Sequence, residues 1–187
     1  MGKTYPGIDG RNAEFIRAQR LFFVATAPAD LDGHLNLSPK GLESFAILNE
    51  NTVAYVDLVG SGVETVAHLR ENGRIVFLFC AFEGPPRLLR LHGRGRAIEP
   101  GDPDWEALAG HFPRYAAARS IIRVEVDRVS DSCGFGVPEY TFVGDRRQLI
   151  DWAERKGAQG LLDYQRDHNA ASIDGLPGLR GPGSEDG

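Results

Sequence analysis

A strand that runs into a glycine-serine-glycine turn and then directly into a helix is the part of this sequence best suited to chemistry; it occupies residues 55–74 (YVDLVGSGVETVAHLRENGR). Gly60 and Gly62 permit backbone conformations that a side chain would forbid. The first helix amides, at residues 63–65, have no carbonyl partners of their own, and the helix dipole adds a positive potential there. The segment therefore predicts an anion pocket that favours phosphate.

A second polar strand end comes earlier in the chain, where residues 33–41 (GHLNLSPKG) read as a strand that ends near Ser38 and Lys40. Its hydroxyl and ammonium groups lie close to a turn, so the two phosphate-friendly ends could converge. Simpler interpretations stay open: Lys40 as a solvated turn lysine, Ser61 as a plain helix cap, and Asn36 and Ser38 as the polar face of a strand.

No other motif with recognisable site chemistry occurs in the sequence. It has no GxSxG elbow, no P-loop and no GxGxxG after a strand, and its five histidines lack a metal-ligand spacing such as HxxxH. Cys80 and Cys133 form no CxxC pair, and we expect a buried small hydrophobe and a passive reduced thiol, respectively. We therefore expect no metal site and nominate no catalytic acid or base.

Composition predicts a globular protein whose partners are small molecules or proteins. With 42% hydrophobic and 25% charged residues the chain has enough apolar material for one core, so we expect a single domain at residues 1–175 and a flexible, glycine- and proline-rich tail at 176–187. The formal net charge of -5 argues against nucleic acid and anionic membranes as partners. No apolar run approaches the roughly 20 residues that cross a bilayer, and no signal peptide is evident, so we expect a cytoplasmic protein that binds a small molecule.

Hydrophobic periodicity predicts a mainly β fold with peripheral helices and a curved, mostly antiparallel sheet or barrel. The strand at 74–82 is apolar on both faces and should be central, whereas the strand at 120–130 alternates as a half-exposed strand does. The six expected strands are 22–26, 34–38, 51–58, 74–82, 87–99 and 120–130, and the expected helices are 11–20, 63–72, 104–112 and 145–157.

Basic residues alternate along one face of the strand at 87–99, namely Arg90, His92, Arg94 and Arg96. Like charges two residues apart repel, so an anionic partner must lie nearby. One interpretation is ion pairing, across a dimer interface or with acidic residues of adjacent strands (Glu99, Glu125 and Asp127). The other is a docking surface for an anionic substrate or a second cofactor.

The order of these elements, with the NLSPKG strand end, the YVDL strand, the GSG helix start and the HLRENGRIVFLFCAF strand, resembles the pyridoxamine 5'-phosphate oxidase family of flavin-binding split barrels. The likeness spans roughly residues 10–130. In that family FMN lies between two subunits of a homodimer, so the resemblance implies an FMN-binding split-barrel homodimer. Carried over by position, it implies that the cofactor is bound by Asn36, Ser38, Lys40, the backbone around Val56 and Asp57, and Ser61, Gly62 and Thr65.

The sequence departs from the oxidase itself in two places. In the oxidase, a serine, an arginine and a lysine bind the phosphate. The corresponding residues 61–64 of this sequence are SGVE, so the two positive charges are missing. Each charge-assisted bond contributes about 1.5 to 3 kcal/mol, so FMN is held more weakly unless Lys40 and the helix amides compensate. The arginine and histidine pair that takes pyridoxamine phosphate is also missing near the chain end, so we do not expect vitamin B6 oxidation.

The resemblance implies an FMN-dependent oxidoreductase acting on an unidentified small organic substrate, with the flavin supplying the chemistry. The weakened phosphate grip leaves three alternatives open: a deazaflavin-dependent reductase, a non-catalytic flavin- or haem-binding carrier or sensor, and a scaffold with an empty pocket. Residues 169–179 (NAASIDGLPGL) either fold over the cofactor cleft or serve only to hold the last helix.

Overall fold

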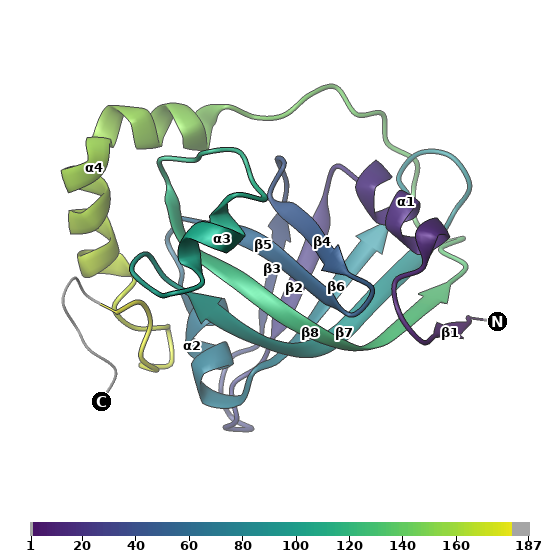
Figure 1. Ribbon diagram of the computed structural model, residues 1–187, viewed down its shortest axis with the longest axis horizontal. Coiled ribbons are helices and arrows are strands. Elements are labelled where there is room, and N and C mark those ends of the chain that lie inside the picture. Colours follow the sequence, from purple (N-terminus) through teal and green to yellow (C-terminus); the bar gives the residue numbers. More distant parts are fainter. Residues whose placement is uncertain (1, 181–187) are drawn as a thin grey trace.

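The computed structural model describes residues 2–180, and within them eight strands form one antiparallel sheet accompanied by four helices (Figure 1). The strand order is β3-β2-β6-β7-β8-β5-β4, and β1 pairs with β8. The edge strands β3 and β4 do not pair with each other, so the sheet stays open. The expected mainly β, mostly antiparallel fold with peripheral helices is therefore confirmed. The strands are Thr4–Tyr5 (β1), Phe22–Thr26 (β2), Asn36–Lys40 (β3), Phe45–Asn49 (β4), Thr52–Leu58 (β5), Arg74–Cys80 (β6), Leu88–Ile98 (β7) and Ala118–Ser132 (β8).

Two strands, β1 and β4, were not expected from the sequence. β1 has two residues, which is too short to show a period. The sequence of β4, FAILN, is a short apolar run that periodicity cannot assign to a strand or a helix. β3 also begins later than expected and includes Pro39, which an edge strand tolerates because one side of it needs no backbone donors.

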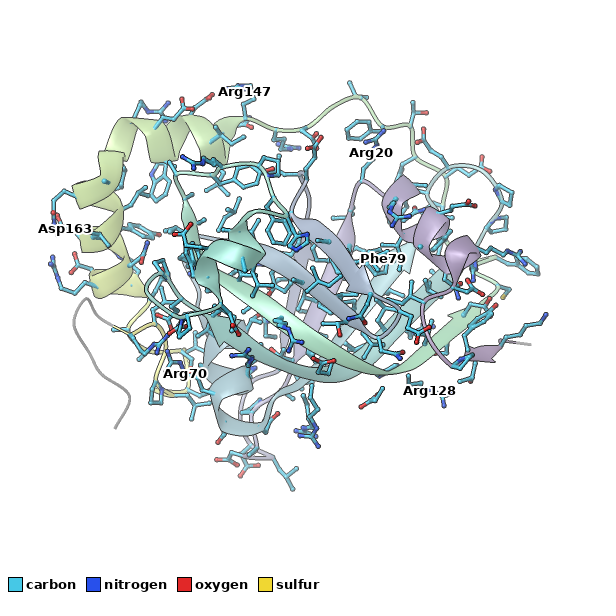
Figure 2. The ribbon with its side chains drawn as sticks, in the orientation of Figure 1. Arg20, Arg70, Phe79, Arg128, Arg147 and Asp163 are labelled. Carbon is cyan, nitrogen blue, oxygen red and sulfur yellow. The ribbon has the colours of Figure 1, made fainter. Side chains whose placement is uncertain are left out.

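Aromatic side chains fill the inside of the curved sheet. Phe22 of β2, Tyr55 of β5 and Phe77 of β6 are buried and lie within ring contact of one another, with Phe22 and Tyr55 5.7 Å apart between ring centroids. Figure 2 shows the labelled Phe79 in the same interior. Lys40 Nζ lies 5.8 Å from the centroid of the Tyr55 ring, so this core directly adjoins the polar end of β3.

The helices lie around the sheet and are Gly10–Ala18 (α1), Glu64–Asn72 (α2), Trp105–Ala109 (α3) and Gln148–His168 (α4). α2 packs against β2, β6 and β7 and ends at Gly73, whose φ of 69° is the left-handed conformation that glycine adopts easily. α4 does not end near Gly157 as expected: the chain kinks there, at a φ of 68°, and continues as a second helical stretch (Figure 1). Among the described residues, no helix combines the length and the apolar character that crossing a membrane requires.

Residues 169–180, which we call the strap, follow α4 and return to the start of α2 (Figure 1). Asn169 Nδ2 donates to the carbonyl oxygen of Gly60 at 2.9 Å, and Leu179 packs against the main core. The strap includes residues 176–180 of the expected tail, and the remainder of that tail, 181–187, lies outside the described residues. The strap therefore holds the last helix and also contacts the turn at residues 60–62.

Candidate functional site

The polar side chains of β3 point toward β5 and α2, and they alternate with the exposed Leu37 and Pro39. Asn36 Nδ2 donates to Thr65 Oγ1 of α2 at 3.0 Å, and Lys40 Nζ donates to Asp57 Oδ1 of β5 at 2.8 Å. The open side of the sheet lets β3 approach β5 although the two strands are not neighbours in it. The two polar segments therefore meet at Asn36 and Thr65, whereas the Lys40 ammonium contacts β5.

Asp57 is fully buried and bridges two cations. Its Oδ1 accepts from Lys40 Nζ and its Oδ2 accepts from Arg119 Nε, each at 2.8 Å. Burial disfavours the charged carboxylate, but attraction to Lys40 and Arg119 outweighs burial and lowers the pKa of Asp57. Two cations against one carboxylate leave a surplus positive charge at the meeting point of β3 and β5.

Arg119 was not identified from the sequence, and a β-bulge in β8 explains its position. Asp57 pairs with Ser120, and Leu58 pairs with Ala118, so Arg119 is the extra residue between them. A bulge changes the direction of a side chain, and here it brings the guanidinium to Asp57. Arg119 is 5% exposed, and its Nη1 has no hydrogen-bond partner among residues 2–180. A buried donor in that state favours binding of an acceptor.

A series of side-chain hydrogen bonds leads from β3 into the interior. Ser38 Oγ donates to Asn36 Oδ1 at 2.9 Å, and Asn36 in turn contacts Thr65. Thr26 Oγ1 and His68 Nδ1 are 2.9 Å apart, which extends the polar region beneath α2. His68 is fully buried, and burial lowers its pKa, so the imidazole is neutral at pH 7. The polar region combines neutral groups with the charged set around Asp57.

The start of α2 carries a negative group. No side chain caps this helix, whose N-cap residue is the buried Val63, and Ser61 is exposed in the preceding turn. Glu64, the first residue of α2, folds its carboxylate against Gly62 so closely that a Cβ on Gly62 would collide with it. Glu64 Oε1 also accepts from the amide of Ile173 in the strap at 3.4 Å. A carboxylate thus lies at the helix start, beside the position expected for phosphate.

The remaining predicted residue, Val56, lies behind this polar region. Its side chain is buried in a second core cluster with Ile98 and Ile121, and its amide donates to the carbonyl of Ser44 at 2.9 Å. The backbone amide of Val56 is therefore already in use. The structure brings Asn36, Ser38 and Thr65 into one hydrogen-bonded group and Lys40 and Asp57 into another, both along β3, and Ser61 and Gly62 lie in the turn before α2.

Within residues 2–180, the basic residues of β7 form no ion pair with the acidic residues named from the sequence, although Arg94 lies opposite Glu125 in the strand register. Arg96 pairs with Asp104 at 2.5 Å, Arg94 Nη1 donates to the carbonyl of Asn72 at 2.6 Å, and Arg90 Nη1 donates to Ser132 Oγ at 3.1 Å. The loop after β7 and the ends of α2 and β8 therefore supply partners that a strand pattern alone does not reveal.

The described part of this region holds no cluster of metal ligands and no paired cysteine. Residues 2–180 contain no group of three or more metal-binding side chains of the His, Cys, Asp or Glu type. Cys80 is buried, and burial raises its thiol pKa, whereas Cys133 is exposed. The site offers cations, amides and hydroxyl groups, a donor set that suits an anionic or strongly polar organic ligand.

Comparison with known proteins places these features in a family context. Residues 8–133 match the family model described as pyridoxamine 5'-phosphate oxidase. Over 195 residues the chain is 40% identical to the Aspergillus flavus protein ustO, described as a pyridoxamine 5'-phosphate oxidase family protein, and the match covers 94% of this chain and 77% of that protein. Among solved structures, a HupZ variant from group A Streptococcus is similar with a TM-score of 0.53, 23% identity and coverage of 67% of this chain and 99% of that one. A Lactobacillus delbrueckii protein of the pyridoxamine 5'-phosphate oxidase type has a TM-score of 0.51, 13% identity and coverage of 67% and 94%.

Proposed function

Because the chain belongs to the pyridoxamine 5'-phosphate oxidase family, we propose that it is a flavin-dependent oxidoreductase that acts on a small organic substrate. FMN is the cofactor that the family resemblance implies. The observation that carries the proposal is the pair of cations at Asp57, because a surplus positive charge and an unpaired guanidinium nitrogen meet there. An acceptor group of a bound flavin would satisfy both.

The residues present fit a flavin at this position. Lys40 and Arg119 supply charge, and the Lys40 side chain is 22% exposed, so a ligand can reach it. Asn36, Ser38 and Thr65 supply amide and hydroxyl groups from the adjoining strand and helix. Small shifts of these side chains would exchange internal hydrogen bonds for bonds to the ligand.

The chain's own residues would bind and orient rather than transfer protons. A bound flavin supplies hydride transfer, so the protein need only position it and tune its surroundings. Asp57 is held ionised by its two cations, and burial raises the pKa of Tyr55 well above its usual value, which keeps the phenol protonated. His68 is buried and neutral. We therefore assign Lys40 and Arg119 to cofactor binding and none of these groups to acid–base catalysis.

Flavin binding by the purified protein tests the proposal directly. We expect the protein to be yellow, or to bind added FMN, and to lose the colour when NADH or NADPH reduces the flavin. A Lys40→Met variant should bind FMN about tenfold to a hundredfold more weakly, because it removes a charge-assisted bond. Quenching of flavin fluorescence measures both affinities, and Lys156→Met, on α4 beside Trp152, is the matched control.

The same titration separates the alternatives. A protein that does not bind FMN but binds deazaflavin would support the deazaflavin-dependent reductase. A Soret band in its absorption spectrum would support the haem-binding carrier or sensor. A colourless protein that binds none of these ligands would contradict the proposal, and the scaffold with an empty pocket would be the remaining alternative. Equal FMN affinity in the wild type and in Lys40→Met would show that Lys40 does not bind the cofactor.

We further propose a homodimer, and the outer face of β3, β2 and β6 supports it. This face carries two adjacent rows of apolar side chains, Leu37-Ala25-Val76 and Pro39-Phe23-Leu78. Leu37 is 69% exposed and the preceding Leu35 is 80% exposed. Contiguous exposed apolar surface of this kind marks an interaction site, and the family resemblance points to a second copy as the occupant.

A Leu37→Glu variant should weaken such a dimer about tenfold or more, because it buries a charge in an apolar contact. Light scattering across a dilution series measures the dissociation. Leu31→Glu is the control, since Leu31 is 99% exposed and lies outside β3. A monomeric wild type, or a Leu37→Glu variant as dimeric as the wild type, would contradict this surface.

A further inference from the structure

The carboxylate of Glu64 occupies the start of α2, where the turn at residues 60–62 was expected to hold a phosphate. It lies against the backbone of Gly62 and leaves no room for a Cβ there, and Oε1 accepts the Ile173 amide at 3.4 Å. A helix start favours a negative group. Glu64 therefore supplies from within the chain the charge that a phosphate would otherwise bring.

The strap adds a second acceptor beside the same turn. Asn169 is fully buried, and its Nδ2 already donates to the carbonyl of Gly60 at 2.9 Å. Its Oδ1 has no partner in the described part of the chain. Gly178 packs so closely against Asn169 and Val63 that a Cβ would not fit between them. Phosphate oxygens need donors, whereas the Glu64 carboxylate and Asn169 Oδ1 add acceptors beside this turn.

We propose that Glu64 determines which flavin the site accepts, by disfavouring the phosphate ester of FMN relative to riboflavin, which has no phosphate. The proposal rests on the flavin site described above. A phosphate monoester carries about 1.5 to 2 negative charges at pH 7, and like charges a few Å apart repel enough to change an affinity about tenfold or more. The site then takes phosphate-free flavins about as readily as FMN.

The test is the ratio of riboflavin to FMN dissociation constants in matched proteins. Both ligands are titrated by fluorescence quenching into the wild type and into Glu64→Gln, which keeps the side-chain shape and removes the charge. Glu64→Ala is the second variant, in case the amide makes a contact of its own. Glu71→Gln is the control, because Glu71 lies on the same helix but contacts the Ala29 amide at 2.6 Å, away from the turn.

We expect the riboflavin dissociation constant divided by the FMN dissociation constant to rise about tenfold or more in both Glu64 variants, because FMN then binds relatively more tightly. The ratio should stay at the wild-type value in Glu71→Gln. Flavin binding with an unchanged ratio in the Glu64 variants would overturn the role of Glu64 and leave the proposed function intact. An equal shift in Glu71→Gln would also overturn it, since the effect would then be one of net charge. Absence of binding by both flavins to every protein would overturn the proposed function and this inference together.

Discussion

An Asp57→Asn variant is expected to lose about 3–5 kcal/mol of unfolding free energy, because it leaves a buried cation without its carboxylate. Asp57 is fully buried, Arg119 is 5% exposed, and the Nε–Oδ2 distance between them is 2.8 Å. Arg119 cannot escape by losing its proton, so the variant must bear the cost of an uncompensated charge. Equilibrium unfolding in urea at neutral pH measures the loss.

The same residue should make the wild type sensitive to acid. The pKa of Asp57 is lowered from its usual 3.8, so its contribution to stability is present above pH 3.8 and is lost as the pH falls through the lowered value. The wild-type unfolding free energy should approach that of Asp57→Asn only below pH 3.8. A constant difference between the two proteins down to the most acidic pH would contradict this assignment.

A double variant separates lost charge pairing from lost shape. Asp57→Leu combined with Arg119→Met replaces the buried pair by apolar side chains, a change that is often neutral when neighbouring packing is kept. We expect it to recover most of the stability lost in Asp57→Asn. It should nevertheless bind flavin poorly, because Arg119, one of the two cations assigned to cofactor binding, is gone. A loss of less than about 1 kcal/mol of unfolding free energy in Asp57→Asn would be typical of a solvated ion pair, and it would contradict the burial of the Asp57–Arg119 pair in the structure.

The convergence of β3 and α2 could be predicted from the sequence because local signals report it. Alternation in NLSPK separates Asn36, Ser38 and Lys40 from the apolar positions, and the GSG turn marks the helix start. The family resemblance then placed the two near each other, and the structure agrees: Asn36 contacts Thr65, and Lys40 contacts Asp57. Local pattern and family position together predict which elements meet, although the bounds of β3 and α4 differ from those expected.

The parts that could not be predicted depend on register and on long-range contacts. Arg119 reaches Asp57 only through a bulge, and a one-residue irregularity in pairing leaves no trace in the hydrophobic pattern of β8. Asp57 itself was expected to offer its backbone to the flavin, whereas its side chain organises both cations. From the sequence, Glu64 reads only as a helix-forming residue. Its side chain folds back toward Gly62 and contacts Ile173 of the strap, more than a hundred residues later in the chain, and a local pattern cannot reveal that contact.

The aromatic core beneath the site gives the second large expectation, in a Phe77→Ala variant. Phe77 is fully buried, and its ring centroid lies 5.4 Å from that of Phe45 and 5.9 Å from that of Tyr55, both in edge-to-face geometry. Truncation removes these contacts and leaves a cavity, so we expect a loss of about 3–5 kcal/mol of unfolding free energy. Phe135→Ala is the control, since Phe135 is 81% exposed and should cost less than about 0.5 kcal/mol.

Phe77→Ala should also weaken flavin binding, although Phe77 lies below the polar site. The Tyr55 ring that Phe77 supports lies 5.8 Å from Lys40 Nζ, so a cavity beneath Tyr55 lets both side chains move. Urea unfolding and flavin titration of the same preparation measure the two effects. The titration is done without urea, where the variant is folded. Full flavin affinity in a strongly destabilised Phe77→Ala protein would show that Asp57 alone holds Lys40 in place. A joint loss would show that the aromatic core determines the geometry of the cations above it.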